Sequence, residues 1–271
     1  MSSKGMIICF GDSNTWGYEP LSGGRYPARA RWVDILAKET GWTTVNAGLN
    51  GRQIPHTEYE MAEIRRILDV LDGAAQNAEG GGAASSAGRG AKVSAACAGD
   101  PDFDMEALRE LCRQEQYEIN EGQTIGQADS EAGGQNVKEP DRQDTSVLAR
   151  PILFWILLGT NDIQMNYRFR AEQAAARMQA LLLEMLDHPA AASGRVQIRV
   201  LGPANVEVGP WTDERSFREM SRLGGLYRQV CRELGVDFTD LWGAGIGLAA
   251  DGDHFSPDGH RKAAEFLAEL L

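Results

Sequence analysis

The chain has few cysteines, and their arrangement excludes the usual cysteine-based scaffolds. Four cysteines occur in 271 residues, and no two have the C-x-x-C spacing of a metal knuckle or a thiol oxidoreductase. A disulfide framework is not expected in a chain of this size with so few cysteines. The cysteines therefore favour a reducing compartment, and we expect a cytoplasmic protein.

Basic residues are also in short supply. Lysine and arginine together number 27 against 39 acidic residues, which gives a formal net charge of −12. Nucleic acids and anionic membranes are bound by clustered lysine and arginine, so neither is expected as a partner. No apolar run approaches the length of a transmembrane helix, and Met1 to Lys4 lead into an apolar segment without the pattern of a secretory signal.

What the chain does contain is a regular alternation of short apolar and amphipathic segments. Strands are predicted where the run is short, apolar and followed by turn residues, at 6–10, 43–46, 152–158, 196–201 and 236–241. Helices are predicted where apolar residues recur at helical spacing, at 31–40, 58–71, 171–186 and 216–234, with a last helix beginning at Ser256. Alternating strands and helices are typical of a parallel, doubly wound α/β sheet.

One segment interrupts this alternation. From about 73 to 148 the composition shifts to Ala, Gly, Ser, Asn and Gln, with only a modest helical pattern from Met105 to Ile119. Such a segment buries too little apolar surface to offset the entropy that ordering costs. We predict a single domain over 1–271 that carries a disordered, low-complexity surface insertion at about 73–148.

A serine follows the first predicted strand directly. In parallel sheets, ligands bind at the carboxyl ends of strands, although a serine in such a turn is by itself most often a helix N-cap. Near the other end of the chain, Asp251 and His254 stand three residues apart, just before the last helix. We interpret Ser13 as a nucleophile, His254 as its base and Asp251 as the group that orients the base.

The remaining histidines are weaker candidates for the base. His188 precedes a proline at a helix end and is expected at the surface, and His260 falls inside the last helix, where packing or capping is its expected role. His56 follows Pro55 in a loop and is a minor candidate for a pocket wall.

Donors for an oxyanion are predicted after the second and third strands. Acyl transfer needs N–H groups aimed at the charge that develops on the substrate oxygen. Gly48 offers an unobstructed backbone N–H, and Asn161 offers a side-chain amide. Both follow strands of the same sheet, so we expect them on the rim that carries Ser13.

Four sequence blocks, in this order, resemble those of the SGNH (GDSL-type) hydrolase superfamily. The blocks are Gly11-Asp12-Ser13, Gly48 within residues 46–52, the segment 159–162 and the segment 251–254. The resemblance implies a three-layer α/β/α, flavodoxin-like fold with a five-stranded parallel sheet. It also implies an oxyanion hole formed by Ser13, Gly48 and Asn161, with His254 and Asp251 completing a triad. Residues 11–17 and 48–52 look most like the arylesterase/perhydrolase branch, which implies short acyl esters and a homo-oligomer.

Three other kinds of site are not expected. The elbow of the α/β-hydrolases needs Gly-x-Ser-x-Gly, and Thr15 stands where its last glycine belongs. The histidines and aspartates after residue 250 lack the H-E-x-x-H spacing of a metal site, so no metal is predicted. Gly243 to Gly247 does not open a helix in the frame of a dinucleotide fingerprint, so no cofactor is predicted.

The sequence therefore predicts a serine esterase that acts on short-chain carboxylic esters. A carbohydrate O-deacetylase and a lysophospholipase or thioesterase of the same fold remain as alternatives, together with a non-catalytic binding relative. Trp16, Ile163 and Trp211 are candidates for the walls of the substrate pocket. A small-molecule ester is the expected partner, and a homo-oligomer is an open possibility.

Overall fold

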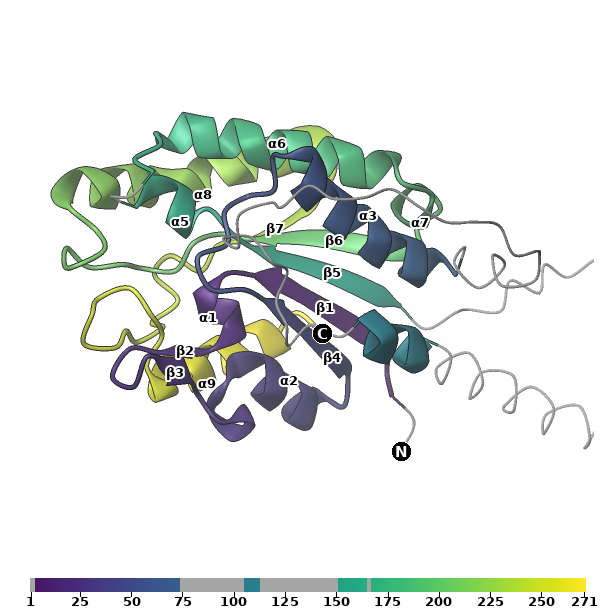
Figure 1. Ribbon diagram of the computed structural model, residues 1–271, viewed down its shortest axis with the longest axis horizontal. Coiled ribbons are helices and arrows are strands. Elements are labelled where there is room, and N and C mark those ends of the chain that lie inside the picture. The colour runs from purple at the N-terminus through teal and green to yellow at the C-terminus, as the bar shows by residue number, and fades with distance from the viewer. Residues whose placement is uncertain (1–2, 74–104, 113–150, 165–166) are drawn as a thin grey trace, which may run out of the picture.

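A computed structural model describes residues 3–73, 105–112, 151–164 and 167–271. Its main sheet has five strands, in the order β4-β1-β5-β6-β7, and all of them are parallel (Figure 1). The strands are β1 (Met6–Gly11), β4 (Thr43–Gly48), β5 (Ile152–Leu157), β6 (Val196–Leu201) and β7 (Asp237–Thr239). The predicted parallel, flavodoxin-like sheet is confirmed, and the long apolar run at 152–158 supplies its central strand.

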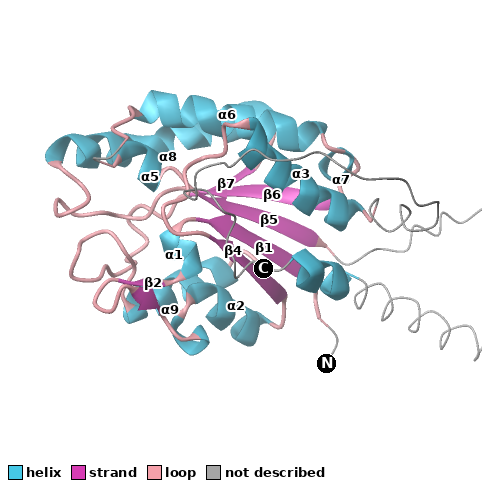
Figure 2. Ribbon diagram, in the orientation of Figure 1, coloured by secondary structure: helices cyan, strands magenta, loops and turns pink. Residues whose placement is uncertain are grey.

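Helices cover both faces of the sheet and make three layers (Figure 2). On one face lie α2 (Trp32–Thr40) and α9 (Pro257–Ala268), which pack against each other. On the other face lie α3 (Glu58–Asp72), α6 (Ala171–Asp187) and α8 (Glu214–Leu234). The predicted three-layer α/β/α architecture is therefore confirmed.

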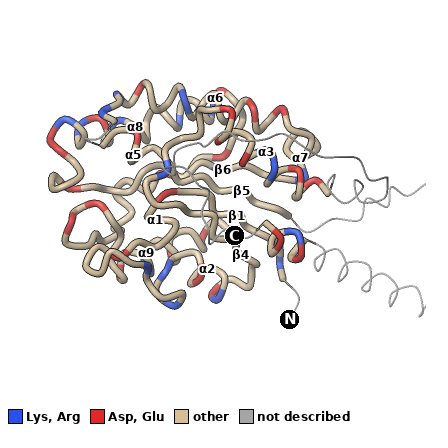
Figure 3. The backbone as a smooth tube through the Cα atoms, in the orientation of Figure 1, with Lys and Arg blue, Asp and Glu red and all other residues tan. Residues whose placement is uncertain are grey.

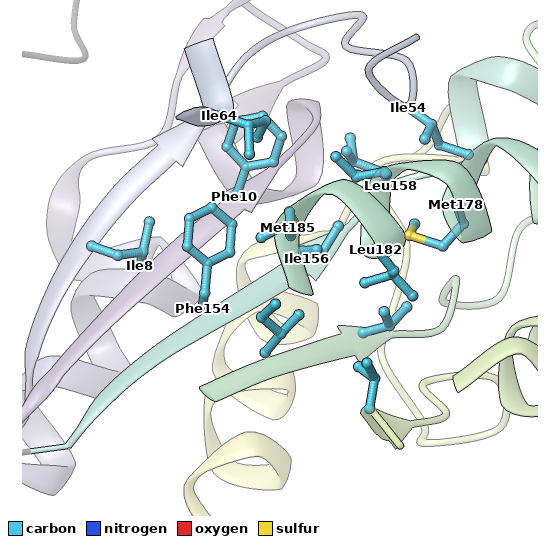
Figure 4. Close-up of a cluster of buried hydrophobic side chains, with 14 of the residues drawn as sticks. Ile8, Phe10, Ile54, Ile64, Phe154, Ile156, Leu158, Met178, Leu182 and Met185 are labelled. Atoms are coloured by element: carbon cyan, nitrogen blue, oxygen red, sulfur yellow. The ribbon is translucent and has the colours of Figure 1, made fainter. Parts of the chain in front are cut away.

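Alternating side chains of the strands divide the core into two clusters. In β1, Ile8 and Phe10 belong to the cluster under α3 and α6, whereas Ile7 and Cys9 belong to the cluster under α2 and α9. This is the two-residue period of a strand that is buried on both faces. Figure 4 shows the first cluster, in which the rings of Phe10 and Phe154 lie 5.9 Å apart, centroid to centroid.

Local capping residues set the helix ends. The hydroxyl of Thr57 caps α3 and forms a capping box with Glu60, and Ser256 caps α9 as predicted. Helix α8 begins at Glu214 rather than at the predicted Ser216, because Asp213 accepts a hydrogen bond of 2.7 Å from the backbone N–H of Ser216.

Short elements without a periodic pattern escaped prediction. They are α1 (Ser13–Trp16), α5 (Thr160–Ile163), α7 (Pro189–Ala192) and an antiparallel hairpin of β2 (Tyr18–Glu19) and β3 (Gly24–Arg25). Three of them, α1, α5 and the hairpin, follow the carboxyl ends of strands or adjoin them, so they shape the rim described below.

Most of the predicted insertion at 73–148 lies outside the described residues. Within it, residues 105–112 form a helix, in agreement with the helical pattern predicted from Met105 onward. Leu108 is 1% exposed, and both it and Cys112 belong to the core cluster of α3 and β1. The expectation of a purely surface insertion is wrong for these two residues, because their apolar side chains complete the core.

Charged residues are distributed over the outer helices, with both signs interspersed (Figure 3). None of the helices in the described part of the chain has the length and apolar character that a membrane span requires.

Candidate active site

The carboxyl ends of all five strands meet at one edge of the sheet. The sheet order reverses at β1, which has β4 on one side and β5 on the other. Ligands bind in such sheets at the crevice beside this reversal point. The segment that follows β1 is α1, whose first residue is Ser13.

Helix α1 is a single turn that is fixed at both ends. The carboxylate of Asp12 caps it by accepting a hydrogen bond of 3.0 Å from the backbone N–H of Asn14. Gly17 closes it with φ of 95°, a conformation that glycine adopts without strain. At Gly11, a Cβ atom would lie 2.1 Å from Oγ1 of Thr15, so only glycine allows the chain to turn this sharply. The turn places the Ser13 hydroxyl at the rim.

The structure brings Ser13, His254 and Asp251 together, as the sequence predicts. The Ser13 Oγ lies 3.0 Å from Nε2 of His254, although 241 residues separate the two. On the other side of the ring, Nδ1 lies 2.6 Å from Oδ2 of Asp251. The second carboxylate oxygen of Asp251 accepts the backbone N–H of His254 at 3.2 Å, so the aspartate holds both the ring and its backbone.

Asn14 joins the two ends of the chain at this point. Its Nδ2 donates to the backbone oxygen of Asp253 at 3.2 Å, and its Oδ1 accepts the backbone N–H of Phe255 at 2.8 Å. Both neighbours of His254 are thus bound to the residue that follows Ser13. The indole N–H of Trp32 in turn donates to the backbone oxygen of Asn14.

The β2–β3 hairpin supplies a cover for the imidazole. The ring of Tyr18 packs on His254 with 4.6 Å between the centroids and 50° between the planes. The tyrosine ring thereby covers one side of the imidazole. Sequence analysis did not single out Tyr18, because its contact depends on how the hairpin folds back.

Burial and hydrogen bonding shift the pKa values of the carboxyl groups in opposite directions. Burial by itself raises the pKa of Asp251, but its hydrogen bonds with His254 and with the N–H of Asp253 outweigh that effect and lower the pKa. Burial raises the pKa of Asp12 to about 7, against the hydrogen bond from Asn14. Burial also raises the pKa of Asp253. Asp251 is therefore the carboxylate that stays ionised beside the histidine.

Asn161 is the second residue of α5, which follows the carboxyl end of β5. Its Nδ2 donates to the backbone oxygen of Arg52 at 3.1 Å, and Asn161 lines the same pocket as Ser13. An amide nitrogen carries two hydrogens, so the second can still be donated to a substrate.

Gly48 ends β4 and adjoins α1, on the predicted rim, but its N–H already has an acceptor. Its N–H donates to Oδ1 of Asn46 at 3.1 Å, and Gly48 is not among the residues that line the pocket. A Cβ there would lie 2.2 Å from the backbone nitrogen of Trp16, so the glycine permits β4 to approach α1. Gly51, three residues on, lines the pocket with φ of 73°.

Arg52 holds the loop after β4 in place. Its buried guanidinium donates to the backbone oxygens of Gly11 and Ala47, at the ends of β1 and β4, and pairs with Glu63 at 2.9 Å. The guanidinium also lies over the ring of Phe10, 4.1 Å from its centroid. One side chain therefore fixes two strand ends, while its carbonyl positions the amide of Asn161.

The pocket above Ser13 has a volume of about 200 Å³. Its walls are Ser13, Tyr18, Asn50, Gly51, Asn161, Gln164, Trp211, Asp253 and His254. Of the three predicted wall residues, only Trp211 is present; it is 42% exposed.

The other two predicted wall residues point elsewhere. Ile163 is fully buried in the core, because α5 turns it inward and leaves the following residue, Gln164, at the pocket. The ring of Trp16 lies against the guanidinium of Arg25, 5.0 Å from the ring centroid. The structure therefore does not support a place for Ile163 or Trp16 in the pocket wall.

The remaining histidines lie outside the pocket. His260 is buried between the rings of Tyr26 and Phe255, as the packing role predicts. His188 is half-buried and caps α7, with Nε2 3.2 Å from Asp69, rather than lying free at the surface. His56 contacts the backbone oxygen of Ile54. No group of three or more His, Cys, Asp or Glu side chains arranged to hold a metal occurs among the residues that the structure describes.

A sequence model of the GDSL-like lipase/acylhydrolase family matches residues 7–267. No curated protein sequence matches the chain.

Several solved structures share the fold. A carbohydrate acetylesterase from Sinorhizobium meliloti superposes with a TM-score of 0.56 at 18% identity, covering 98% of this chain and 97% of that one. The aryl esterase of M. smegmatis gives 0.56 at 20% identity, with coverage of 98% and 97%. A member of the lipolytic protein G-D-S-L family from Veillonella parvula gives 0.50 at 15% identity, covering 98% of each chain.

Proposed function

The chain belongs to the GDSL-like lipase/acylhydrolase family and is a carboxylic ester hydrolase, and on that premise we propose that it is a serine esterase that cleaves short-chain esters through an acyl-enzyme. The observation that carries the proposal is the contact of 3.0 Å between the Ser13 hydroxyl and Nε2 of His254. A hydroxyl near its free pKa is a weak nucleophile and needs a base within this distance.

In the first half of the reaction, Oγ of Ser13 attacks the ester carbonyl carbon while Nε2 of His254 takes its proton. Asp251 holds the ring and stabilises the imidazolium through the contact of 2.6 Å to Nδ1. The tetrahedral intermediate then expels the alcohol, which takes the proton from Nε2, and leaves the acyl group on Ser13. In the second half, water replaces the alcohol and repeats these proton transfers, which frees the acid and restores Ser13.

The developing oxyanion needs donors on the opposite side of Oγ from the histidine. We assign this role to the backbone N–H of Ser13, at the first position of α1, and to the second hydrogen on Nδ2 of Asn161. For the third donor we propose the backbone N–H of Gly51 in place of that of Gly48. The pocket position of Gly51 supports this choice, whereas the N–H of Gly48 already donates to Asn46.

A carbohydrate O-deacetylase is the second candidate. The observation that favours it is the pocket lining, where Asn50, Gln164 and Asp253 present polar groups and Trp211 offers an exposed aromatic face at the rim. Such a lining suits a hydroxylated substrate better than a long acyl chain. A small pocket of about 200 Å³ also disfavours the lysophospholipase alternative.

Hydrolysis of p-nitrophenyl acetate tests the proposed nucleophile. We expect Ser13→Ala to lower kcat by at least about 10³-fold, because the acyl-enzyme can no longer form. Ser221→Ala, which removes an exposed hydroxyl on α8, provides the control for general effects of removing a serine. A Ser13→Ala protein that is folded and keeps a near-native rate would refute the assignment.

A further inference from the structure

The pocket contains a carboxyl group for which the reaction described above has no use. Asp253 lies between the two predicted triad residues in sequence, its side chain is 4% exposed, and it lines the pocket beside Ser13 and His254. Its Oδ2 lies 4.0 Å from Nε2 of His254, on the same side of the ring as the Ser13 hydroxyl. The carboxyl therefore adjoins the place where the ester reacts.

The partners of Asp253 leave hydrogen-bonding capacity unused. Gln164 forms a side-chain hydrogen bond with the carboxyl. Oδ1 of Asp253 is buried and has no hydrogen-bond partner among the described residues. Among the described residues, the only ion-pair contact of Asp253 is the one of 4.0 Å to Nε2 of His254, and no lysine or arginine pairs with it. A buried carboxyl with an incomplete set of partners costs stability, so a role in the fold does not account for it.

The position of the carboxyl relative to the reacting atoms indicates what it contacts. When the tetrahedral intermediate collapses, the bond between the acyl carbon and the alcohol oxygen breaks, and Nε2 of His254 gives its proton to that oxygen. The alcohol oxygen must therefore lie within hydrogen-bond distance of Nε2. Since Oδ2 of Asp253 is 4.0 Å from the same nitrogen, a donor on the neighbouring carbon of the alcohol falls within its reach.

On the basis of the proposed function, we propose that Asp253 selects the leaving group: it accepts a hydrogen bond from a hydroxyl on the carbon next to the ester-bearing carbon. The preferred substrates are then short acyl esters of polyols or sugars, and simple alkyl and aryl esters lack the donor that this site recognises. Gln164 and Asn50, which also line the pocket, offer polar groups to further hydroxyls of such an alcohol.

The state of the carboxyl is compatible with this role. Burial raises the pKa of Asp253, while His254 and the hydrogen bond with Gln164 lower it in part. Either protonation state keeps an oxygen that can accept a hydroxyl hydrogen. An anionic leaving group, by contrast, would be repelled by the carboxylate form of Asp253, so esters of phosphorylated or carboxylated alcohols are disfavoured.

Three acetate esters of nearly equal size test the proposal. In 2-hydroxyethyl acetate the alcohol carries the neighbouring hydroxyl, in propyl acetate a methyl group replaces it, and in 2-methoxyethyl acetate the oxygen remains but cannot donate. For each ester, kcat/KM is divided by the rate constant for its hydrolysis by hydroxide, which corrects for the inductive effect of the oxygen. The corrected ratio is this value for the hydroxyethyl ester over that for the methoxyethyl ester. We expect the wild type to prefer the hydroxyethyl ester by about tenfold or more, the size typical of a hydrogen bond to a charged group.

Two variants locate the source of that preference. Asp253→Leu should bring the corrected ratio close to one, and the nearly isosteric Asp253→Asn should bring it to an intermediate value because one acceptor oxygen remains. Asp258→Asn removes an exposed carboxylate on α9 outside the pocket and should keep the wild-type ratio. A merely structural role for Asp253 would lower both rate constants together and leave the ratio unchanged.

The outcomes separate this inference from the proposed function. A wild-type ratio near one, with hydrolysis that depends on Ser13, would overturn the role of Asp253 and leave the esterase intact. Absence of Ser13-dependent turnover of all three esters would overturn both. Where the preference is found, 1-O-acetylglycerol and a mono-O-acetyl methyl xylopyranoside distinguish an open-chain polyol from a sugar ring as its source.

Discussion

At the scale of single residues, the proposed reaction depends on how Asp251 orients His254. Asp251 contacts both Nδ1 and the backbone N–H of His254, and its pKa is lowered by those contacts even though burial opposes the change. It therefore fixes which ring nitrogen carries the hydrogen and leaves Nε2 free to act on Ser13.

Replacing Asp251 with asparagine tests this arrangement. The amide retains the shape of the side chain but can donate to Nδ1, which stabilises the wrong tautomer of His254. We expect kcat for p-nitrophenyl acetate to fall by about 10³ to 10⁴-fold with little change in KM. The matched change Asp258→Asn should leave kcat within about twofold. If the two variants lost activity equally, Asp251 would have no special relation to the histidine.

His260 makes a second prediction at this scale, for stability rather than for activity. Burial among Tyr26 and Phe255 lowers its pKa from 6.5 to about 3, with further contributions from Arg31 and His254. Because the folded-state pKa is below the unfolded value, the unfolded chain binds the extra proton between these two pH values. Stability is therefore complete above pH 6.5 and is lost as the pH falls toward 3.

The prediction is measured by urea unfolding of the wild type and of His260→Gln at several pH values from 4 to 7. The difference in free energy of unfolding between the two proteins should change by about 1.4 kcal/mol per pH unit below 6, in the direction that favours the variant in acid. A difference that is constant with pH would show that His260 titrates alike in both states.

At the scale of elements, the rim is built from short segments that are held by a few buried polar groups. Arg52 connects the ends of β1 and β4 through the backbone oxygens of Gly11 and Ala47, and its own carbonyl accepts from Asn161. Asp162 plays the corresponding part for α5, where it accepts the N–H of Ile54 at 3.0 Å and pairs with Arg177 at 3.1 Å. The loops after β4 and β5 are thus joined to each other.

Removal of the guanidinium measures the strength of this connection. Arg52→Leu leaves Glu63 without its cation and removes one donor each from the backbone oxygens of Gly11 and Ala47, so we expect a loss of about 3 to 5 kcal/mol in the free energy of unfolding. Arg66→Leu, on the exposed side of α3, is the control and should cost no more than about 0.5 kcal/mol. A loss below about 1 kcal/mol for Arg52→Leu would contradict the role described here.

The elements also differ in how far the sequence could predict them. Strands such as 152–158 and helices such as 58–71 were predictable because burial imposes a period on their residues. Ser13, Asn161 and His254 were predictable as neighbours, because parallel strands end on one edge. Tyr18, Gly51 and Asp253 were not, since their places depend on loop conformations and on contacts between distant segments. Ile163 and Trp16 were assigned to the pocket wrongly, because a one-turn helix has no periodicity from which to read its buried side.

At the scale of the whole molecule, the core extends further along the chain than composition suggested. Leu108 lies within a low-complexity segment, yet its side chain is buried in the cluster that also contains Phe10 and Ile64. The sequence around it carries too few apolar residues to predict that contact. A deletion across this segment therefore removes part of the core, in contrast to the expectation for a surface insertion.

The contribution of Leu108 is measured by thermal or urea unfolding of Leu108→Ala. The loss of a buried leucine should reduce the free energy of unfolding by about 2 to 4 kcal/mol. Leu183→Ala, at an exposed position on α6, is the matched control and should change it by no more than about 0.5 kcal/mol. Equal effects of the two substitutions would show that the 105–112 helix does not pack against the core in solution.

We propose that two ends of the chain, 241 residues apart, form one nucleophilic site. The most direct test is intact-protein and peptide mass spectrometry after reaction with a fluorophosphonate, which modifies only an activated serine. We expect one adduct per chain, located on Ser13, and its loss in a folded His254→Ala variant. An adduct on another serine, or equal labelling with and without His254, would contradict it.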